Sequence, residues 1–95
     1  MVALLTLELR IEGAHSLKDK RQVLRSLKDR LRAQFNVAVA ELDHSDLWQR
    51  ATLGVVGISD SRSYLDGLMQ NVERQSMRIA NNAGAEVADS FLEYL

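Results

Sequence analysis

Apolar and polar residues alternate along the first part of the chain, residues 2–11. A period of two is typical of a β-strand that buries one face and leaves the other open. The predicted buried face consists of Ala3, Leu5, Leu7, Leu9 and Ile11. The predicted open face consists of Val2, Leu4, Thr6, Glu8 and Arg10.

The period then changes to that of a helix. Ser16 and Asp19 have the spacing of a capping box at a helix start, although Glu or Gln is the more usual second residue. Asn36 suits the left-handed residue that often ends a helix. The apolar stripe between these two ends consists of Leu17, Leu24, Leu27, Leu31 and Phe35.

Three further strands are predicted from short apolar or alternating runs. Val37 to Leu42 forms a short strand, and Asp43 to Asp46 forms a turn rich in Asx and Ser residues. Leu47 to Ser59 forms the next strand, and Ala85 to Leu95 forms the last.

A second helix separates the last two strands. Asp60 or Ser61 would cap its start, and residues 81–84 would form its exit. Its apolar stripe consists of Leu65, Leu68, Met69, Val72, Ile79, Ala80 and Ala83.

The predicted element order is β-α-β-β-α-β within 95 residues. Right-handed crossovers place both helices of this order on one face of a four-stranded antiparallel sheet. We therefore predict a ferredoxin-like α+β sandwich that forms one domain over residues 1–95, since chains of this size rarely divide. A core of this size is small, so association between copies is a reasonable way to bury more apolar area.

Cysteine and proline are both absent from the chain. The lack of cysteine excludes a disulfide scaffold, thiolate metal ligands and a cysteine nucleophile, and it fits a reducing cytoplasm. Residues 1–13 lack a basic leader and contain Glu8 and Arg10, so we predict neither a signal peptide nor a membrane span. The expectation is a cytoplasmic protein.

Charge is distributed unevenly, although the formal net charge is only −1. Residues 16–35 hold seven basic residues and two acids, so the rest of the chain carries a net charge of −6. Five of the cations follow each other at spacings of three and four, which places them in one row about 21 Å long on the helix. The row consists of Lys18, Arg21, Arg25, Lys28 and Arg32.

Such a row matches the phosphate backbone of a nucleic acid, which binds cations through counterion release. The alternative is a solvated helix face that binds nothing. Aromatic residues are 5% of the chain and do not form the pair that reads bases in an RNA-recognition motif. A glycine-rich phosphate loop is also absent, and we expect no cofactor.

The open face of the predicted sheet is a second candidate surface. In the strand over residues 47–59, alternation directs Leu47 to the core and Trp48 to the open face. Large amphipathic side chains on an uncovered sheet are typical of interfaces, although the indole could instead lie flat over its own strand. A homodimer contact or a small-ligand-sensing surface is the alternative function. Its residues would be Val2, Leu4, Trp48, Arg50 and Val56.

His44, with Asp43 and Asp46, is the remaining chemical candidate. Imidazole and carboxylates bind metals, and they also serve in acid–base catalysis. All three residues fall in a tight predicted turn, where Asp and His are favoured for backbone reasons, and no further ligand stands at a suitable spacing. We therefore expect no metal site and no enzyme.

Residues 15–54 resemble the YlxP-like family of small bacterial proteins, a domain of unknown function. The resemblance is most specific in SLKDKR (16–21), FNVAVAE (35–41) and DLWQRATLG (46–54). It implies a ferredoxin-like fold and a bacterial cytoplasmic location. Genes of this family often lie among those for transcription termination, translation initiation and ribosome maturation, which suggests work on the ribosome or its RNA. The family has no established catalytic residues.

Overall fold

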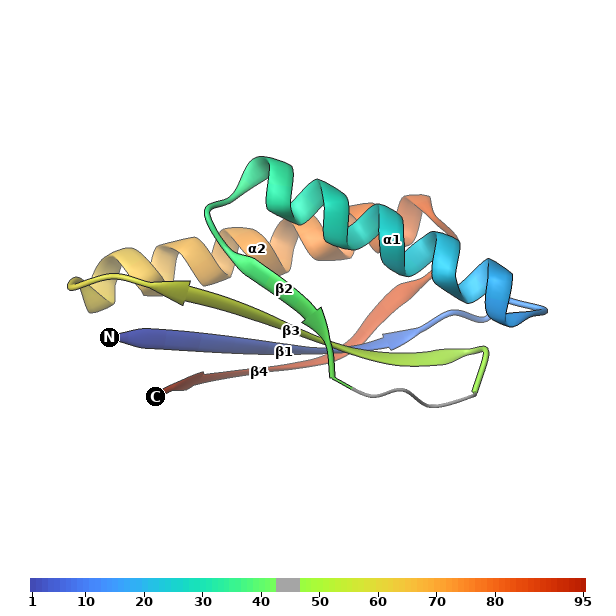
Figure 1. Ribbon diagram of the computed structural model, residues 1–95, viewed down its shortest axis with the longest axis horizontal. Coiled ribbons are helices and arrows are strands. Elements are labelled where there is room, and N and C mark those ends of the chain that lie inside the picture. Colours follow the sequence, from blue (N-terminus) through green and yellow to red (C-terminus); the bar gives the residue numbers. More distant parts are fainter. Residues whose placement is uncertain (43–46) are drawn as a thin grey trace.

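The computed structural model describes residues 1–42 and 47–95. The chain forms six elements, which are β1 (Val2–Arg10), α1 (Leu17–Gln34), β2 (Ala38–Glu41), β3 (Arg50–Ile58), α2 (Arg62–Asn82) and β4 (Glu86–Tyr94). The strands form one antiparallel sheet in the order β2-β3-β1-β4, and both helices lie on the same side of it (Figure 1). This arrangement confirms the predicted ferredoxin-like sandwich.

The core lies between the sheet and the two helices. The predicted buried face of β1 is confirmed, because Leu5 and Leu7 expose 1% or less of their surface and Ile11, just past the strand, exposes 1%. In α1 the stripe is buried at Leu24, Leu27 and Leu31. Burial of one face per element is what stabilises an α+β sandwich of this kind.

The start of α1 agrees with the prediction, and its end does not. Ser16 caps the helix, with its Oγ accepting a hydrogen bond from the Asp19 backbone N–H at 3.1 Å. The carboxylate of Asp19 accepts from the backbone N–H of His15 (3.0 Å), which completes a variant of the capping box. The prediction that Asn36 ends the helix in a left-handed conformation is wrong. Phe35 ends it in an extended conformation instead, with its N–H bonded to Leu31.

The ends of α2 follow the prediction. Ser61 caps its start. At its exit Gly84 has a φ of 79°, and the N–H of Ala85 donates to the carbonyl of Ala80 at 2.8 Å. These are the features of a Schellman motif, whose left-handed conformation has the lowest energetic cost for glycine. Ser76 fills a buried position of the helix that the predicted stripe left out, and its Oγ bonds the Val72 carbonyl.

The strand predicted over residues 47–59 begins three residues late, at Arg50. Leu47 was predicted to face the core, and this is wrong, because the residue is 60% exposed. Its carbonyl instead accepts a hydrogen bond (2.8 Å) from the buried ammonium of Lys20 in α1. Trp48 is half exposed in the turn before β3, so its predicted position within the strand is also wrong.

The turn predicted over Asp43 to Asp46 lies outside the described residues. Within the described part of the chain, neither helix is long and apolar enough to cross a bilayer.

Candidate functional site

One side of α1 carries the five cations of the predicted row, which we call the basic face (Lys18, Arg21, Arg25, Lys28 and Arg32). The helix is amphipathic, so burial of its leucine stripe against the sheet fixes which side faces water. Arg21 and Arg25 are exposed or nearly so, and Lys28 is partly covered. The row therefore lies on the surface, as predicted.

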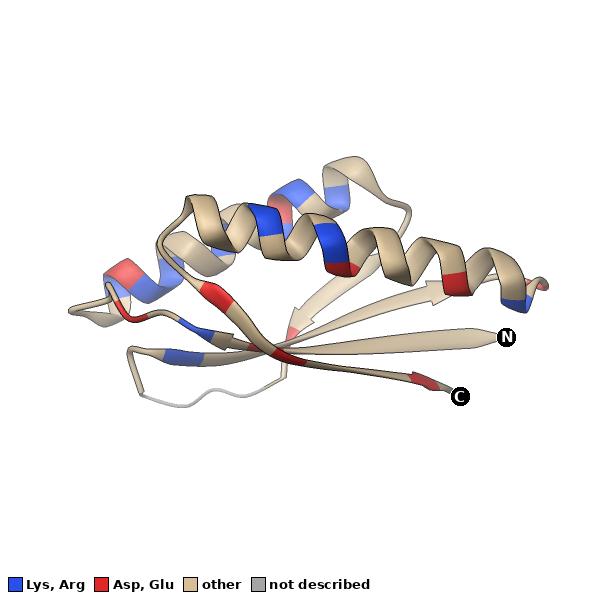
Figure 2. Ribbon diagram, turned by 180° about the vertical axis from the view of Figure 1, so that it is seen from behind, with Lys and Arg blue, Asp and Glu red and all other residues tan. Residues whose placement is uncertain are grey.

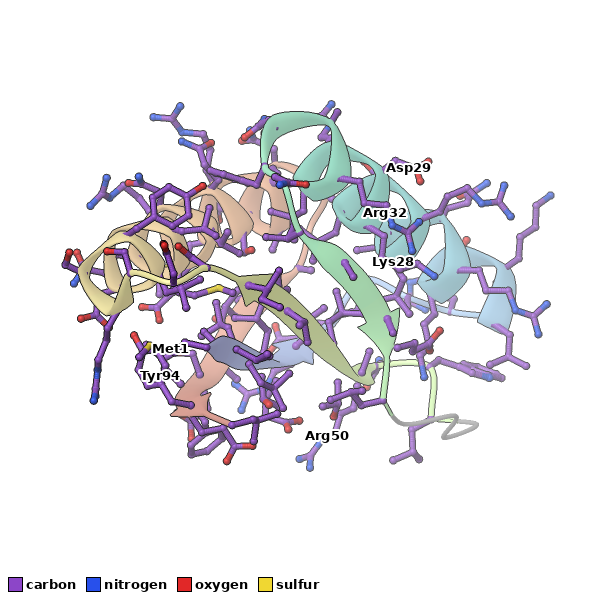
Figure 3. The ribbon with its side chains drawn as sticks, turned by 60° about the vertical axis from the view of Figure 1, so that its left-hand side comes forward. Met1, Lys28, Asp29, Arg32, Arg50 and Tyr94 are labelled. Carbon is purple, nitrogen blue, oxygen red and sulfur yellow. The ribbon has the colours of Figure 1, made fainter. Side chains whose placement is uncertain are left out.

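A hollow of about 340 Å³ lies at this face, between α1 and the edge strand β2. Figure 3 shows Lys28, Asp29 and Arg32 close together on the helix above β2. Lys18 does not line this hollow, so the structure brings together four of the five predicted cations. Its lining residues are Arg21, Leu24, Arg25, Lys28, Asp29, Arg32 and Glu41.

Arg32 is the most constrained cation of the hollow. Its Nη2 donates to the carbonyl oxygen of Val39 in β2 at 2.7 Å, and its Nη1 lies 4.0 Å from the Asp29 carboxylate. The first contact is a good charge-assisted hydrogen bond, whereas the second is at the limit of an ion pair. Arg32 therefore joins α1 to the sheet edge and holds one wall of the hollow in place.

The other cations of the hollow are not neutralised. Within residues 1–42 and 47–95, the ion pairs are Arg10–Glu86 and Arg32–Asp29, and neither involves Arg21, Arg25 or Lys28. Guanidinium and ammonium groups in this state can still attract an external anion, because no described carboxylate forms an ion pair with them.

Glu41 is a part of the site that the sequence interpretation missed. The β2–β3 register places it opposite the buried Leu53, so its side chain lies on the helix-covered side and lines the hollow with the arginines. Among the described residues, four cations and two carboxylates therefore line the hollow. The sequence already indicated on which side of the sheet Glu41 lies, because Val39 and Glu41 share one face of any strand formed by residues 37–42.

The second predicted surface is the face of the sheet opposite the helices, which we call the open face. The register pairs Leu4 with Val56, Val2 with Ile58 and Arg10 with Arg50, which places all of these residues on that face. Figure 3 shows Arg50 on the far side of the sheet from Lys28 and Arg32. Four of the five predicted interface residues therefore share this face, with Arg50 at the opposite end from Val2. Trp48 lies in the turn before β3.

Phe91 is the aromatic residue of the open face that the prediction lacked. It lies opposite Thr6 in the β1–β4 register, and Thr6 belongs to the face that points away from the core. Its side chain is 55% exposed. Alternation along the last strand shows which of its residues share a face with Phe91. Only the pairing with β1 shows that this face is the open one.

The candidates His44, Asp43 and Asp46 lie outside the described residues. Among the residues that are described, no three His, Asp or Glu side chains gather as they would around a metal ion. A hollow of about 430 Å³ before the start of β3 is lined by Leu47, Trp48, Gln49 and Arg50. These side chains form no catalytic pair, since Arg50 is the one charged group among them.

The element order and strand order define the class of this protein as a ferredoxin-like α+β sandwich. Sequence comparison identifies the family. Residues 2–91 match the family described as "Protein of unknown function (DUF503)", and the chain belongs to this family. It is also 36% identical over 72 residues to the uncharacterized protein YlxP of Bacillus subtilis (strain 168), covering 76% of this chain and 78% of that protein. The YlxP-like resemblance is confirmed.

Solved structures support the fold alone. The protein YJCS matches with a TM-score of 0.62 at 8% identity, over 100% of this chain and 99% of that one. A C-terminal segment of the alpha subunit of aIF2 from Pyrococcus abyssi matches with a TM-score of 0.57 at 13% identity. That match covers the whole of this chain but only half of the crystallised segment. Identities this low carry a likeness of fold and no likeness of function.

Proposed function

We propose that this protein is a non-enzymatic RNA-binding protein, which holds the phosphate backbone of structured RNA on the basic face of α1. The observation that supports this most is the hollow beside β2, where Arg21, Arg25 and Lys28 stand together without an ion pair in the described part of the chain. Like charges at helical spacings of three and four repel each other, and an external polyanion would relieve that repulsion.

The physical basis is the release of counterions from the RNA. Each phosphate that a cation neutralises frees condensed counterions, so affinity depends steeply on salt concentration. The row extends about 21 Å along the helix, long enough to follow several successive phosphates. The described residues that line the hollow include no aromatic side chain on which a base could stack, so recognition would depend on backbone shape.

The RNA of the ribosome is the partner we propose, since the genes of YlxP-like proteins often lie among genes for translation and ribosome maturation. A ribosomal partner would require a cytoplasmic location. The competing interpretation is that the basic face is simply solvated, and it makes the opposite prediction for charge reversal.

The experiment is a charge-reversal comparison. The double variant Arg21→Glu/Arg25→Glu should bind a fluorescent RNA hairpin and purified small ribosomal subunits at least about tenfold more weakly than the wild type. Fluorescence anisotropy and co-sedimentation measure the two affinities. Thermal stability should stay nearly unchanged, since neither side chain is buried.

The matched control reverses two arginines on the surface of the other helix, Arg74→Glu/Arg78→Glu. It changes the net charge of the protein by the same amount but leaves the basic face intact, so binding should fall by no more than about twofold. Equal losses in the two double variants, or no loss in either, would contradict the proposal.

A further inference from the structure

The open face is a broad apolar surface that no described element covers (Figure 1). Its exposed apolar side chains come from all four strands or from residues beside them, with Ile58 at 75%, Phe91 at 55% and Leu42 at 52% exposure. Leu42 lies on this face, because a Cβ atom added to Gly54 would come within 2.9 Å of it. Exposed apolar side chains that gather on one face are typical of protein interaction sites.

Among the residues that the structure describes, the charged side chains of the open face lie at one of its ends and along its β4 edge. At that end Arg10 bonds Glu86 (2.8 Å), and Thr52 donates to Glu8 (2.8 Å). Arg50, which pairs with Arg10 across the β1–β3 ladder, makes no ion pair among the described residues. The β4 strand itself carries acids and no basic residue (Figure 2).

We infer that the open face binds a second copy of this chain, with the sheets packed face to face about a two-fold axis parallel to the strands. Rotation about this axis places the β2–β3 half of the open face of one copy against the β1–β4 half of the open face of the other. It also places the charged ends of the two copies together.

Charge complementarity supports this axis. Arg50, which forms no ion pair with any described residue, belongs to the β3 half, and the acids Glu86 and Asp89 belong to the β4 edge. Exchange of the halves places Arg50 of one copy over Arg10 of the other, because the two residues stand at the same level of β3 and β1. Glu86 lies beside that Arg10 on the neighbouring strand, where its carboxylate would bridge both arginines. Glu93 would face the outer edge of the partner sheet, at the rim where water solvates it.

Side-chain size supports the same arrangement. The β2 edge of the face carries the small residues Ala38 and Ala40, whereas the β1–β4 half carries Leu4 and Phe91 at the same levels of the sheet. Phe91 of one copy would therefore pack on Ala40 of the other. Packed sheets interdigitate large and small side chains in this way at a separation of about 10 Å.

An axis perpendicular to the strands gives poorer contacts. It would place Arg50 over Ile58 at the apolar end of the other copy, where the cation would be buried without a partner. It would also place Glu93 against Asp89, which adds repulsion between like charges.

Sedimentation equilibrium of the full chain tests the inference. The wild type should sediment at twice the chain mass of 10.7 kDa at high concentration. Phe91→Glu should raise the concentration at which the dimer dissociates by about tenfold or more. The matched control Met77→Glu changes an exposed apolar residue on α2 in the same way, and it should leave the dimer intact.

Ile58→Glu, at the most exposed apolar position of the face, provides a second variant if Phe91→Glu fails to fold. The axis is tested by cross-linking, because the chain has no cysteine of its own. Ala40→Cys/Phe91→Cys should yield covalent dimers with a short bis-maleimide, and either single variant should yield far fewer.

A wild type that stays at the single-chain mass over the whole concentration range overturns the inference, even if the open face captures another protein. It is equally overturned if the folded Glu variants remain as dimeric as Met77→Glu. Cross-linking of the single variants as efficiently as the double variant overturns the proposed axis.

Discussion

Single side chains decide how strongly the basic face attracts an anion, and Glu41 opposes that attraction. Its carboxylate lines the same hollow as Arg21, Arg25 and Lys28, on the helix-covered side of β2. A fixed negative charge at this position reduces the field that the arginines project into water.

Replacement of this carboxylate should therefore strengthen binding. We expect Glu41→Gln to raise the affinity for an RNA hairpin by roughly two- to fivefold at low salt, because a repulsion of a few tenths of a kcal/mol or more is removed. Fluorescence anisotropy measures the effect. Glu93→Gln, on the β4 edge, removes the same charge far from the hollow and should change the affinity little. Weaker binding by Glu41→Gln would contradict a phosphate site here.

Two glycines of α2 and its exit allow the backbone conformation to be tested by single substitutions. Gly84 has a φ of 79° at the end of α2, so Gly84→Ala should lower the free energy of unfolding by about 1 kcal/mol. Gly67 lies on the exposed side of α2 and has open space where an added Cβ would stand. Gly67→Ala should therefore raise the free energy of unfolding by roughly 0.5–1 kcal/mol. Urea unfolding measures both changes, and the same sign for both would contradict the described helix end.

Between elements, the hydrogen bond from Arg32 to Val39 joins α1 to the edge strand β2. The β2 strand is only four residues long and pairs with β3 alone, so it depends on contacts of this kind. Loss of the bond would also free one wall of the hollow.

We expect Arg32→Ala to lower the free energy of unfolding by about 1 kcal/mol, less than for a fully buried hydrogen bond to a charged group, because the Arg32 side chain remains half exposed. Chemical denaturation checks the value. Arg30→Ala removes an arginine that makes no ion pair within the described residues, so its effect should stay within about 0.5 kcal/mol. Equal effects of the two substitutions would show that the contact with Val39 contributes nothing.

The elements also show how far the sequence determines this structure. The period-two pattern of residues 2–11 was sufficient for β1, because both its faces follow from local alternation. The start of β3 could not be predicted in this way. Leu47 continues the apolar alternation, but its carbonyl is bound by Lys20, which is 27 residues away in the chain. Local pattern cannot reveal such a tertiary contact.

The candidate site was predictable to a similar extent. Helical spacing was enough to find the basic face, since its cations lie on one element. Glu41 and Phe91 were missed because their importance depends on which element lies beside them, α1 in one case and β1 in the other. Asn36 was misplaced because a residue type that favours the left-handed conformation does not require it.

On the scale of the whole molecule, the two proposed surfaces lie on opposite sides of the sheet. Both helices cover one side, and the open face forms the other (Figure 1). Face-to-face packing of two sheets would therefore leave both basic faces directed outward, where each could contact RNA.

The two surfaces should be separable by substitution. We expect Phe91→Glu to keep its affinity for a short hairpin that can occupy only one site, within about twofold, because α1 is unchanged. Conversely, Arg21→Glu/Arg25→Glu should keep the oligomeric state of the wild type. Anisotropy and sedimentation on both variants measure this. Loss of RNA binding in the folded Phe91→Glu variant would mean that the two surfaces act together.

The salt dependence of RNA binding is the most direct test of the basic face. The logarithm of the binding constant plotted against the logarithm of salt concentration should fall with a slope of about −3 to −4 for four phosphate contacts, and Arg25→Gln should reduce the slope by about 1. A slope near zero, or the same slope in the wild type and in Arg25→Gln, would contradict the claim that this face binds phosphates.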